Sequence, residues 1–158
     1  MPKLLYMKKI KEILHYIDLP SELIDLIYQY AVFIPKTKER LLDAINKWID
    51  NESLLLRGKI INHLGHINDW DVSNITDMSE LFENKIFFND KIEDWDVSNV
   101  VNMEHMFCYA SNFNQSLKKW NVSNVKKMKG MFYNTENFDQ NINDWDVSNV
   151  EDMTCMFF

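Results

Sequence analysis

Residue types that could carry out chemistry recur in this chain at a fixed interval of 25 positions. Four tryptophans set the interval: Trp70, Trp95, Trp120 and Trp145. An indole ring can stack on a sugar or a base, the aspartates beside most of these tryptophans could ligate calcium, and the Ser-Asn pair after each could form a row of hydrogen-bonding groups. The elements that position these residues decide between such uses and a structural role.

An overlay of the repeats shows that each tryptophan belongs to a shared set of apolar positions. In the third repeat the set is Leu117, Trp120, Val122, Val125, Met128, Met131, Phe132 and Phe138. A single turn of 25 residues cannot bury so many large side chains, so adjacent turns must stack to form a continuous core. The tryptophans are therefore predicted to be rungs of that core and not stacking platforms for a ligand.

The spacing of the apolar residues changes along each turn. After the second Val or Ile, the apolar residues follow at steps of three, three and one positions, which is typical of a helix. Between Phe113 and Leu117 the inward residues instead alternate with Asn114 and Ser116, as in a strand. We therefore predict an α/β fold, a leucine-rich-repeat-like solenoid with a short strand and a short helix in every 25-residue turn. The strands of successive turns would form a parallel ribbon sheet along one face.

The polar residues beside the tryptophans are predicted to have structural roles in this solenoid. The Ser-Asn pairs precede the helical stretches, where such side chains cap helix N-termini. The pairs are Ser73-Asn74, Ser98-Asn99, Ser123-Asn124 and Ser148-Asn149. The flanking aspartates are read as solvated or capping groups, because calcium needs six to eight oxygen ligands and the third turn substitutes Lys119 and Asn121. No metal site is expected there.

An α-helical N-terminal cap is predicted to precede the array. Residues 1–35 form a helical segment, residues 36–66 a capping helix with its lead-in, and residues 67–158 the solenoid, whose last turn is incomplete. Thr37 is a good N-cap for the capping helix. The apolar face of that helix would be Leu41, Leu42, Ile45, Trp48 and Ile49. Such a helix covers the hydrophobic cross-section that a solenoid exposes at its end.

The start of an earlier predicted helix resembles an F-box. It reads Leu19-Pro20-Ser21-Glu22-Leu23-Ile24-Asp25-Leu26-Ile27, and an F-box opens with Leu-Pro-x-Glu-Leu followed by an apolar helix. The resemblance is confined to this helix start, and the Leu-Trp-Arg ending of the family is missing. It implies docking on the adaptor of a cullin-type ubiquitin ligase. The matching residues are Leu19, Pro20, Glu22, Leu23, Ile24 and Ile27.

The repeats themselves resemble another family. The string Phe-Asn-Gln-x-Leu-x-x-Trp-x-Val-Ser-Asn-Val-x-x-Met-x-x-Met-Phe, at 113–132, looks like the 25-residue repeat of the BspA-like leucine-rich repeat family. The lead-in from Thr37 to Trp70 is similar to the segment that commonly precedes the first such repeat. The resemblance implies a leucine-rich-repeat-like solenoid used for adhesion or protein recognition. Intracellular members from large DNA viruses and protists fit the Asn-, Ile- and Lys-rich composition of this chain.

Charge and the few reactive residues disfavour several classes of function. Residues 67–158 carry 7 Lys+Arg against 16 Asp+Glu, a net charge of −9, which disfavours nucleic acid as a partner. Cys108 and Cys155 stand at non-equivalent positions and are expected to be free thiols. His63 and His66 lack the further ligands of a metal site, and no phosphate loop or nucleophile motif occurs. We therefore predict no enzyme activity and no cofactor.

The predicted function is that of a non-enzymatic protein–protein interaction module. Framework residues repeat between turns while outward positions before each tryptophan vary, and variable side chains on a constant scaffold form recognition surfaces. The varying positions are Asn89, Lys91, Glu93, Asn114, Ser116, Lys118, Asp139, Asn141 and Asn143. The alternatives are an F-box-like substrate adaptor of a ubiquitin ligase and a surface adhesion protein.

The ends of the chain lead to expectations about location and assembly. No signal peptide and no run of about 18 apolar residues is found, so an intracellular, cytoplasmic location is expected, the cytoplasm of a host cell included. A surface location is the alternative. The fourth turn stops after Phe158, with Met153, Met156 and Phe157 expected to be exposed, which indicates a fragment of a longer array or self-association through this turn.

Overall fold

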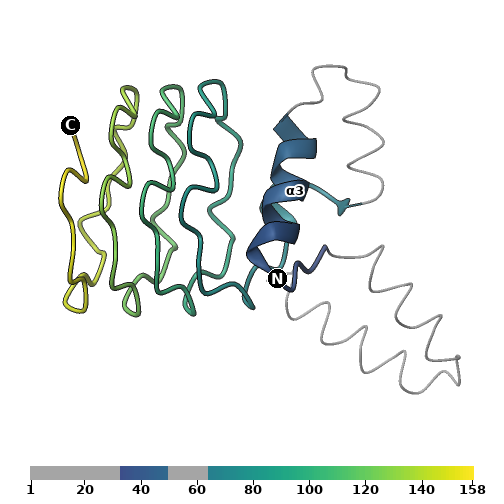
Figure 1. Ribbon diagram of the computed structural model, residues 1–158, viewed down its shortest axis with the longest axis horizontal. Helices are drawn as coiled ribbons and strands as arrows, with labels where there is room; N and C mark the ends of the chain where they lie inside the picture. The colour runs from purple at the N-terminus through teal and green to yellow at the C-terminus, as the bar shows by residue number, and fades with distance from the viewer. Residues whose placement is uncertain (1–32, 50–63) are drawn as a thin grey trace, which may run out of the picture.

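The computed structural model describes residues 33–49 and 64–158, and the helices predicted before residue 33 lie outside these ranges. The helical elements named within them are the α-helix α3 (Lys38–Ile49) and the single 3-10 turn η1 (Ile67–Asp69). The chain after Trp70 is a stack of 25-residue turns. Figure 1 shows the turns side by side, with α3 at one end of the stack and the C-terminus at the other.

The helix α3 begins and packs as its sequence predicts. Thr37 precedes it, and the Oγ1 atom of Thr37 accepts a hydrogen bond from the N–H of Arg40 at 3.3 Å. Its buried residues recur at intervals of three and four, which is the spacing of one helix face. They are Leu41, Ala44, Ile45 and Trp48. This face joins the hydrophobic core of the turns, and the rings of Trp48 and Trp70 meet edge-on at 6.0 Å.

Successive turns place equivalent side chains on top of one another, so the apolar positions of the sequence become columns of the core. The phenylalanine column is Phe82, Phe107, Phe132 and Phe157, whose neighbouring ring centroids lie 5.3–5.5 Å apart. The tryptophan rings stack at 6.5 Å between Trp70 and Trp95 and between Trp120 and Trp145. All four tryptophans are buried, which confirms that they are rungs of the core.

Each tryptophan after the first also bonds its turn to the one before it. The indole Nε1–H of Trp95 donates to the carbonyl of Ile67 at 2.8 Å, and Trp120 and Trp145 make the equivalent bond to a carbonyl 28 residues earlier. The Nε1 atom of Trp70 has no partner among the residues that the structure describes. The repeat therefore satisfies the buried N–H of three of the four indoles, as a buried tryptophan requires.

The backbone of each turn bonds to the next turn at alternate residues. In the first turn four N–H groups donate to carbonyls 24 residues later, at 2.8–3.0 Å, and the pattern repeats 25 and 50 residues further on. The four donors are Met78, Glu80, Phe82 and Asn84. The polar backbone of this part of the stack is therefore satisfied between turns, as a buried backbone requires.

The predicted α/β architecture is wrong. Within residues 70–158 no turn contains a strand or an α-helix, and pairing between turns is limited to isolated parallel bridges such as that between Asp77 and Asn102. This part of the chain is therefore not a leucine-rich-repeat-like solenoid with a parallel ribbon sheet. The stretches predicted as helices are successions of β-turns, in which an N–H donates to the carbonyl three residues earlier, as Met106 does to Met103.

The turns do not form α-helices because they contain residues in the left-handed conformation. Positions 10 and 14 residues after a tryptophan have φ between 52° and 62°. They are occupied by Glu80, Asn84, His105, Tyr109, Gly130, Asn134 and, in the last turn, Cys155. A left-handed residue interrupts the bonding of an α-helix, and in the first three turns its N–H donates to the following turn. Consecutive β-turns thus bury the same apolar spacing that a helix would, and periodicity alone did not separate the two.

The stretch predicted as a strand also lacks a ladder of backbone bonds. The N–H of Asn114 donates to the side-chain Oδ1 of Asn89 in the preceding turn, at 2.9 Å, and not to a backbone carbonyl. The N–H of Phe113 closes a β-turn onto Ala110. Because a side-chain amide joins the turns at this position, the alternation of residues 113–117 does not produce a sheet.

Candidate functional site

The structure places the nine predicted recognition residues in three rows that run along the stack, and each turn contributes one residue to each row. The first row bonds the turns to each other, because Asn89 Oδ1 accepts from the N–H of Asn114 and Asn114 Oδ1 accepts from the N–H of Asp139, at 2.9 and 3.0 Å. The side-chain amides of Gln115 and Gln140 donate to the same two oxygens, at 3.0 and 2.8 Å. Asn89 and Asn114 are therefore part of the scaffold.

The other two rows are partly bonded and largely exposed. The hydroxyl of Ser116 donates to Glu93 Oε1 in the preceding turn at 2.9 Å, and Asn141 Oδ1 accepts from the N–H of Asn143. The exposed members of these rows are Lys91, Lys118, Asn141 and Asn143. All nine residues of the three rows are polar, so this surface offers hydrogen bonds and charges to a partner.

The Ser-Asn pairs hold the bends beside the tryptophans and join neighbouring turns, and they do not cap helices. Asp71 Oδ1 accepts from the N–H and the hydroxyl of Ser73, at 3.1 and 2.6 Å, and the serine N–H of each later turn is bound in the same way. The Nδ2 of Asn99 donates to the carbonyl of Ser73 at 2.9 Å. Within the described ranges, no three His, Cys, Asp or Glu residues are placed to hold a metal ion.

A polar cluster at the same corner surrounds Asp94. Its carboxylate accepts from Lys119 Nζ at 2.7 Å and from Asn68 Nδ2 at 2.6 Å, and Lys119 also lies 3.6 Å from Glu93. The hydrogen bonds from Lys119 and Asn68 lower the pKa of Asp94, and the bond to Asp94 raises the pKa of Lys119. Lys119, which replaces an acidic residue in the third turn, therefore forms ion pairs with the second turn.

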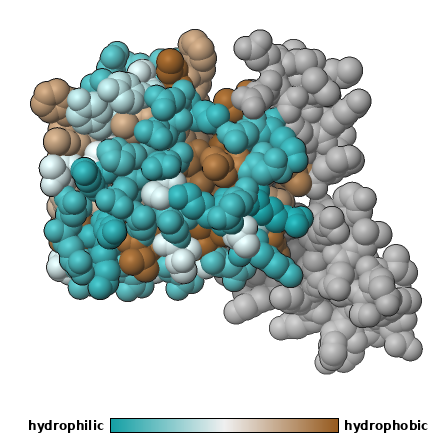
Figure 2. Space-filling view, viewed as in Figure 1, coloured by the Kyte–Doolittle hydropathy of each residue, from teal (hydrophilic) through white to brown (hydrophobic). Residues whose placement is uncertain are grey.

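Apolar side chains that are exposed or half-buried gather along one edge of the stack, which we call the aromatic edge. It comprises Ile86, Phe87, Tyr109, Tyr133 and Phe158. Phe87 is 84% exposed, and the rings of Tyr109 and Tyr133 meet at 5.7 Å. The loops of this edge lie together at the top of Figure 1, and Figure 2 shows hydrophobic groups along the same side of a largely hydrophilic face.

The sequence interpretation missed the aromatic edge because its members do not share one repeat position. Phe87 stands 17 residues after its tryptophan, Tyr109 stands 14 after and Tyr133 stands 13 after. The available signal was a large apolar residue outside the shared core positions. Such a residue has no place in the core columns, so it must lie on the surface.

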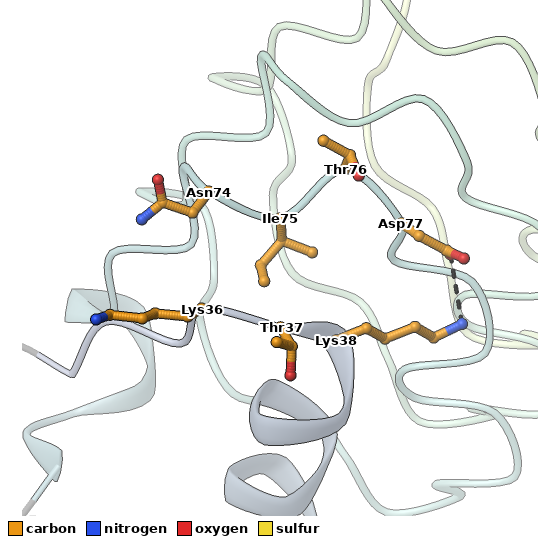
Figure 3. Close-up of a pocket in the computed structure, with 7 residues that line it drawn as sticks. All are labelled: Lys36, Thr37, Lys38, Asn74, Ile75, Thr76 and Asp77. Atoms are coloured by element: carbon orange, nitrogen blue, oxygen red, sulfur yellow. Dashed lines mark hydrogen bonds and ion pairs between the residues drawn. The ribbon is translucent and has the colours of Figure 1, made fainter.

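A pocket of about 140 Å³ lies at the N-terminal end of the stack, between the segment before α3 and the first turn (Figure 3). Its lining residues are Lys36, Thr37, Lys38, Asn74, Ile75, Thr76 and Asp77. Asp77 Oδ1 lies 3.3 Å from Lys38 Nζ, which also donates to the hydroxyl of Ser79. Burial raises the pKa of Asp77, but hydrogen bonds from Ser79 and Lys38 outweigh it and hold the pKa below its ordinary value.

The remaining predicted groups are placed as follows. The F-box-like residues Leu19, Pro20, Glu22, Leu23, Ile24 and Ile27 lie outside the described ranges. Cys108 and Cys155 are free thiols, and burial raises the pKa of Cys108. In the part of the chain that the structure describes, no helix has the length and apolar character needed to cross a membrane.

Comparison with known families classifies the repeats. A family model described as "Mycoplasma protein of unknown function, DUF285" matches residues 56–158. The chain belongs to the DUF285 family. No curated protein and no solved structure matches the chain. The DUF285 region contains the four tryptophans and the whole aromatic edge, whereas Lys36, Thr37 and Lys38 of the pocket precede it.

Proposed function

We propose that this DUF285 protein is a non-enzymatic protein-interaction module that binds a partner protein through the aromatic edge. The observation that carries the proposal is the exposure of Ile86, Phe87 and Tyr109 on one edge of a stack whose apolar columns are buried throughout the first two turns. Aromatic side chains supply much of the binding energy at protein interfaces, while most polar contacts add complementarity. The aromatic edge therefore ranks above the three polar rows as the binding surface.

The backbone beneath the aromatic edge supports this role. The N–H groups of Asn84 and Tyr109 donate to carbonyls of the following turn at 2.8 and 2.9 Å. The hydroxyl of the buried Thr135 donates to the carbonyl of Phe107 at 2.7 Å. A backbone held in this way loses little conformational freedom on binding, so less of the interaction energy is spent on ordering the loops that carry these side chains.

The charge of the turns indicates the chemistry of the partner. Residues 67–158 hold 7 Lys+Arg against 16 Asp+Glu, a net charge of −9. A partner with an apolar pocket rimmed by Lys and Arg would receive the phenyl and phenol rings and would be attracted by the acidic stack. Its cations could also lie over the faces of Tyr109 and Tyr133.

The test uses variants that the scaffold already accepts. Phe87 and Tyr109 are replaced by asparagine, because asparagine stands at the equivalent positions in other turns. These equivalents are Asn112 and Asn137 for Phe87, and Asn84 and Asn134 for Tyr109. The matched control replaces Lys91 and Lys118 of the polar rows by asparagine. A partner is first identified by photo-cross-linking from position 87, and its affinity for each variant is then measured by calorimetry.

We expect the double replacement on the aromatic edge to weaken the partner at least about 30-fold, because two aromatic anchors together contribute about 2 kcal/mol or more. The polar-row control should change the affinity by less than about threefold. A partner that is lost by the polar-row variant and kept by the edge variant would assign binding to the polar rows and contradict the proposal.

A further inference from the structure

The pocket at the N-terminal end of the stack is lined by residues whose equivalents in every later turn donate backbone hydrogen bonds to the turn before. In the second turn, the N–H groups of Val101 and Asn102 converge on one oxygen, the carbonyl of Thr76, at 2.8 and 3.3 Å. The same geometry recurs at Lys126 and Lys127 and at Glu151 and Asp152, with distances of 2.7–3.3 Å. Each turn thus presents a pair of N–H groups to a single oxygen of the turn before it.

The first turn has the same pair of N–H groups, but no carbonyl oxygen of the described residues accepts from them. The equivalent residues are Thr76 and Asp77, which line the pocket, and neither N–H has a hydrogen-bond partner within the described ranges. A side-chain donor shows the same difference. Asn99, like its later equivalents, donates Nδ2 to a serine carbonyl of the preceding turn, whereas the amide of Asn74 lines the pocket and has no such bond.

The segment before α3 does not supply the missing acceptors. It runs beside the first turn at Phe33, whose carbonyl accepts from the N–H of Asp71 at 3.0 Å. Beyond that bond, residues 36–38 and 74–77 lie on opposite sides of the pocket, as Figure 3 shows. Its volume of about 140 Å³ accommodates a group of a few heavy atoms.

The charges around the pocket favour an anion. Lys38 is paired with Asp77, so these two side chains compensate each other on one side of the pocket. Lys36 has no ion pair among the described residues, and in Figure 3 its ammonium group lies toward the same end of the pocket as the amide of Asn74. Unpaired N–H donors beside an uncompensated cation match a ligand whose oxygens only accept and carry negative charge.

We propose that this pocket binds a small oxyanion, a carboxylate or a phosphate, on the N–H groups of Thr76 and Asp77, with the uncompensated charge of Lys36 at the other end of the pocket attracting it. One oxygen of the ligand takes the position that a carbonyl of the preceding turn occupies elsewhere in the stack. Consecutive backbone N–H groups that face one concavity are a common way of capturing such anions. The site is separate from the aromatic edge and does not depend on the proposed function.

The test is a titration of the full-length, ¹⁵N-labelled chain with acetate, with inorganic phosphate and with chloride at matched ionic strength. The amide signals of Val101 and Asn102 are the internal control, because they belong to the same repeat positions but already have an acceptor. We expect the amides of Thr76 and Asp77 to shift saturably with acetate or phosphate, with a dissociation constant on the order of millimolar. The arm that saturates at lower concentration identifies the preferred anion.

Two variants of equal charge change complete the test. Lys36→Met should weaken the binding about tenfold, because it removes the uncompensated positive charge of the pocket, while Lys91→Met on the polar rows should leave it unchanged. Equal shifts with chloride, shifts of Val101 and Asn102 as large as those of Thr76 and Asp77, or an unaltered titration of the Lys36 variant would each overturn the proposal. The amide spectra of both variants report directly that the stack is folded.

Discussion

Replacing Phe107 by alanine tests whether the aromatic columns hold the stack together. The side chain of Phe107 is fully buried, and its ring lies 5.3 Å from Phe82, 5.5 Å from Phe132 and 4.2 Å from Phe113. Truncation of a buried phenylalanine costs about 3–5 kcal/mol, and each aromatic pair contributes about 0.5–1.5 kcal/mol beyond the burial itself. With these three stacked partners and the tilted ring of Trp120 at 6.2 Å lost, we expect Phe107→Ala to lower the free energy of unfolding by about 5 kcal/mol.

Phe157 is a matched control in the same column. It is 56% exposed, and its ring stacks on that of Phe132 at 5.4 Å. Because full burial of a phenylalanine contributes about 1.5–3 kcal/mol, removal of a side chain that is less than half buried should cost about 1 kcal/mol. The same substitution in the same column is therefore expected to differ by about 4 kcal/mol between an inner and an outer turn.

Urea unfolding followed by tryptophan fluorescence measures both variants, since all four repeat tryptophans lie in the core. The midpoints should differ while the slope of free energy against urea stays that of the unsubstituted chain. Costs for Phe107→Ala and Phe157→Ala that agree within about 1 kcal/mol would refute the conclusion that inner stacking supplies the stability.

Three further predictions follow from single contacts. Trp120→Phe removes the indole hydrogen bond to the carbonyl of Ile92, which keeps only its bond from the N–H of Trp95, and should cost about 0.5–1.5 kcal/mol more in urea unfolding than Trp70→Phe, whose Nε1 has no partner among the described residues; equal costs would contradict this. Gly130→Ala, at φ +57°, places a Cβ 2.6 Å from the ring of His105 and should cost about 2–4 kcal/mol. In the His105→Ala background the overpacking part of that cost should vanish, so a double-mutant coupling below about 0.5 kcal/mol would count against the contact. Because the pKa of Asp77 is lowered by folding, its carboxylate stabilises the fold above its unfolded pKa of about 3.9, and this contribution is lost as the pH falls through the lower folded pKa. Asp77→Asn should therefore flatten the dependence of unfolding free energy on pH below about pH 5, and a curve parallel to that of the unsubstituted chain would argue against this role.

Local chemistry was enough to predict α3. Thr37 supplies an N-cap, and the residues buried on one face, such as Leu41 and Trp48, recur at helical spacing. A helix closes its hydrogen bonds within its own segment, so a stretch of sequence holds nearly all the information that its formation needs. Its place at the end of the turns also follows from the apolar face that it must bury.

The turns themselves were only half predictable. The columns of Trp, Met and Phe were evident, but the strand and the helix predicted for each turn were both wrong. Left-handed residues such as Glu80, His105 and Tyr109 make the difference, and none of them is a residue type that requires this conformation. Their φ angles follow from bonds to the neighbouring turn, which no single repeat contains.

The two proposed sites lie outside the predicted polar rows for a related reason. Variation between repeats selected the polar rows, yet Asn89 and Asn114 bond the turns to each other. The aromatic edge is assembled from different repeat positions, and in the pocket the N–H groups of the first turn lack, among the described residues, the acceptor that each later turn receives from the turn before it. Both features are differences between turns in space, so an overlay of repeats, which looks for sameness, does not show them.

The sequence by itself determined which side chains are buried together. Its period of 25 residues, with large apolar groups at fixed positions, requires stacking because one turn cannot cover them alone. Only the tertiary structure decided where the backbone hydrogen bonds go. The same apolar pattern can be buried by a helix, whose N–H groups bond within the turn, or by β-turns, whose N–H groups also reach the next turn. The choice rests on contacts between turns, and it sets which side chains remain on the aromatic edge and which donors face the pocket.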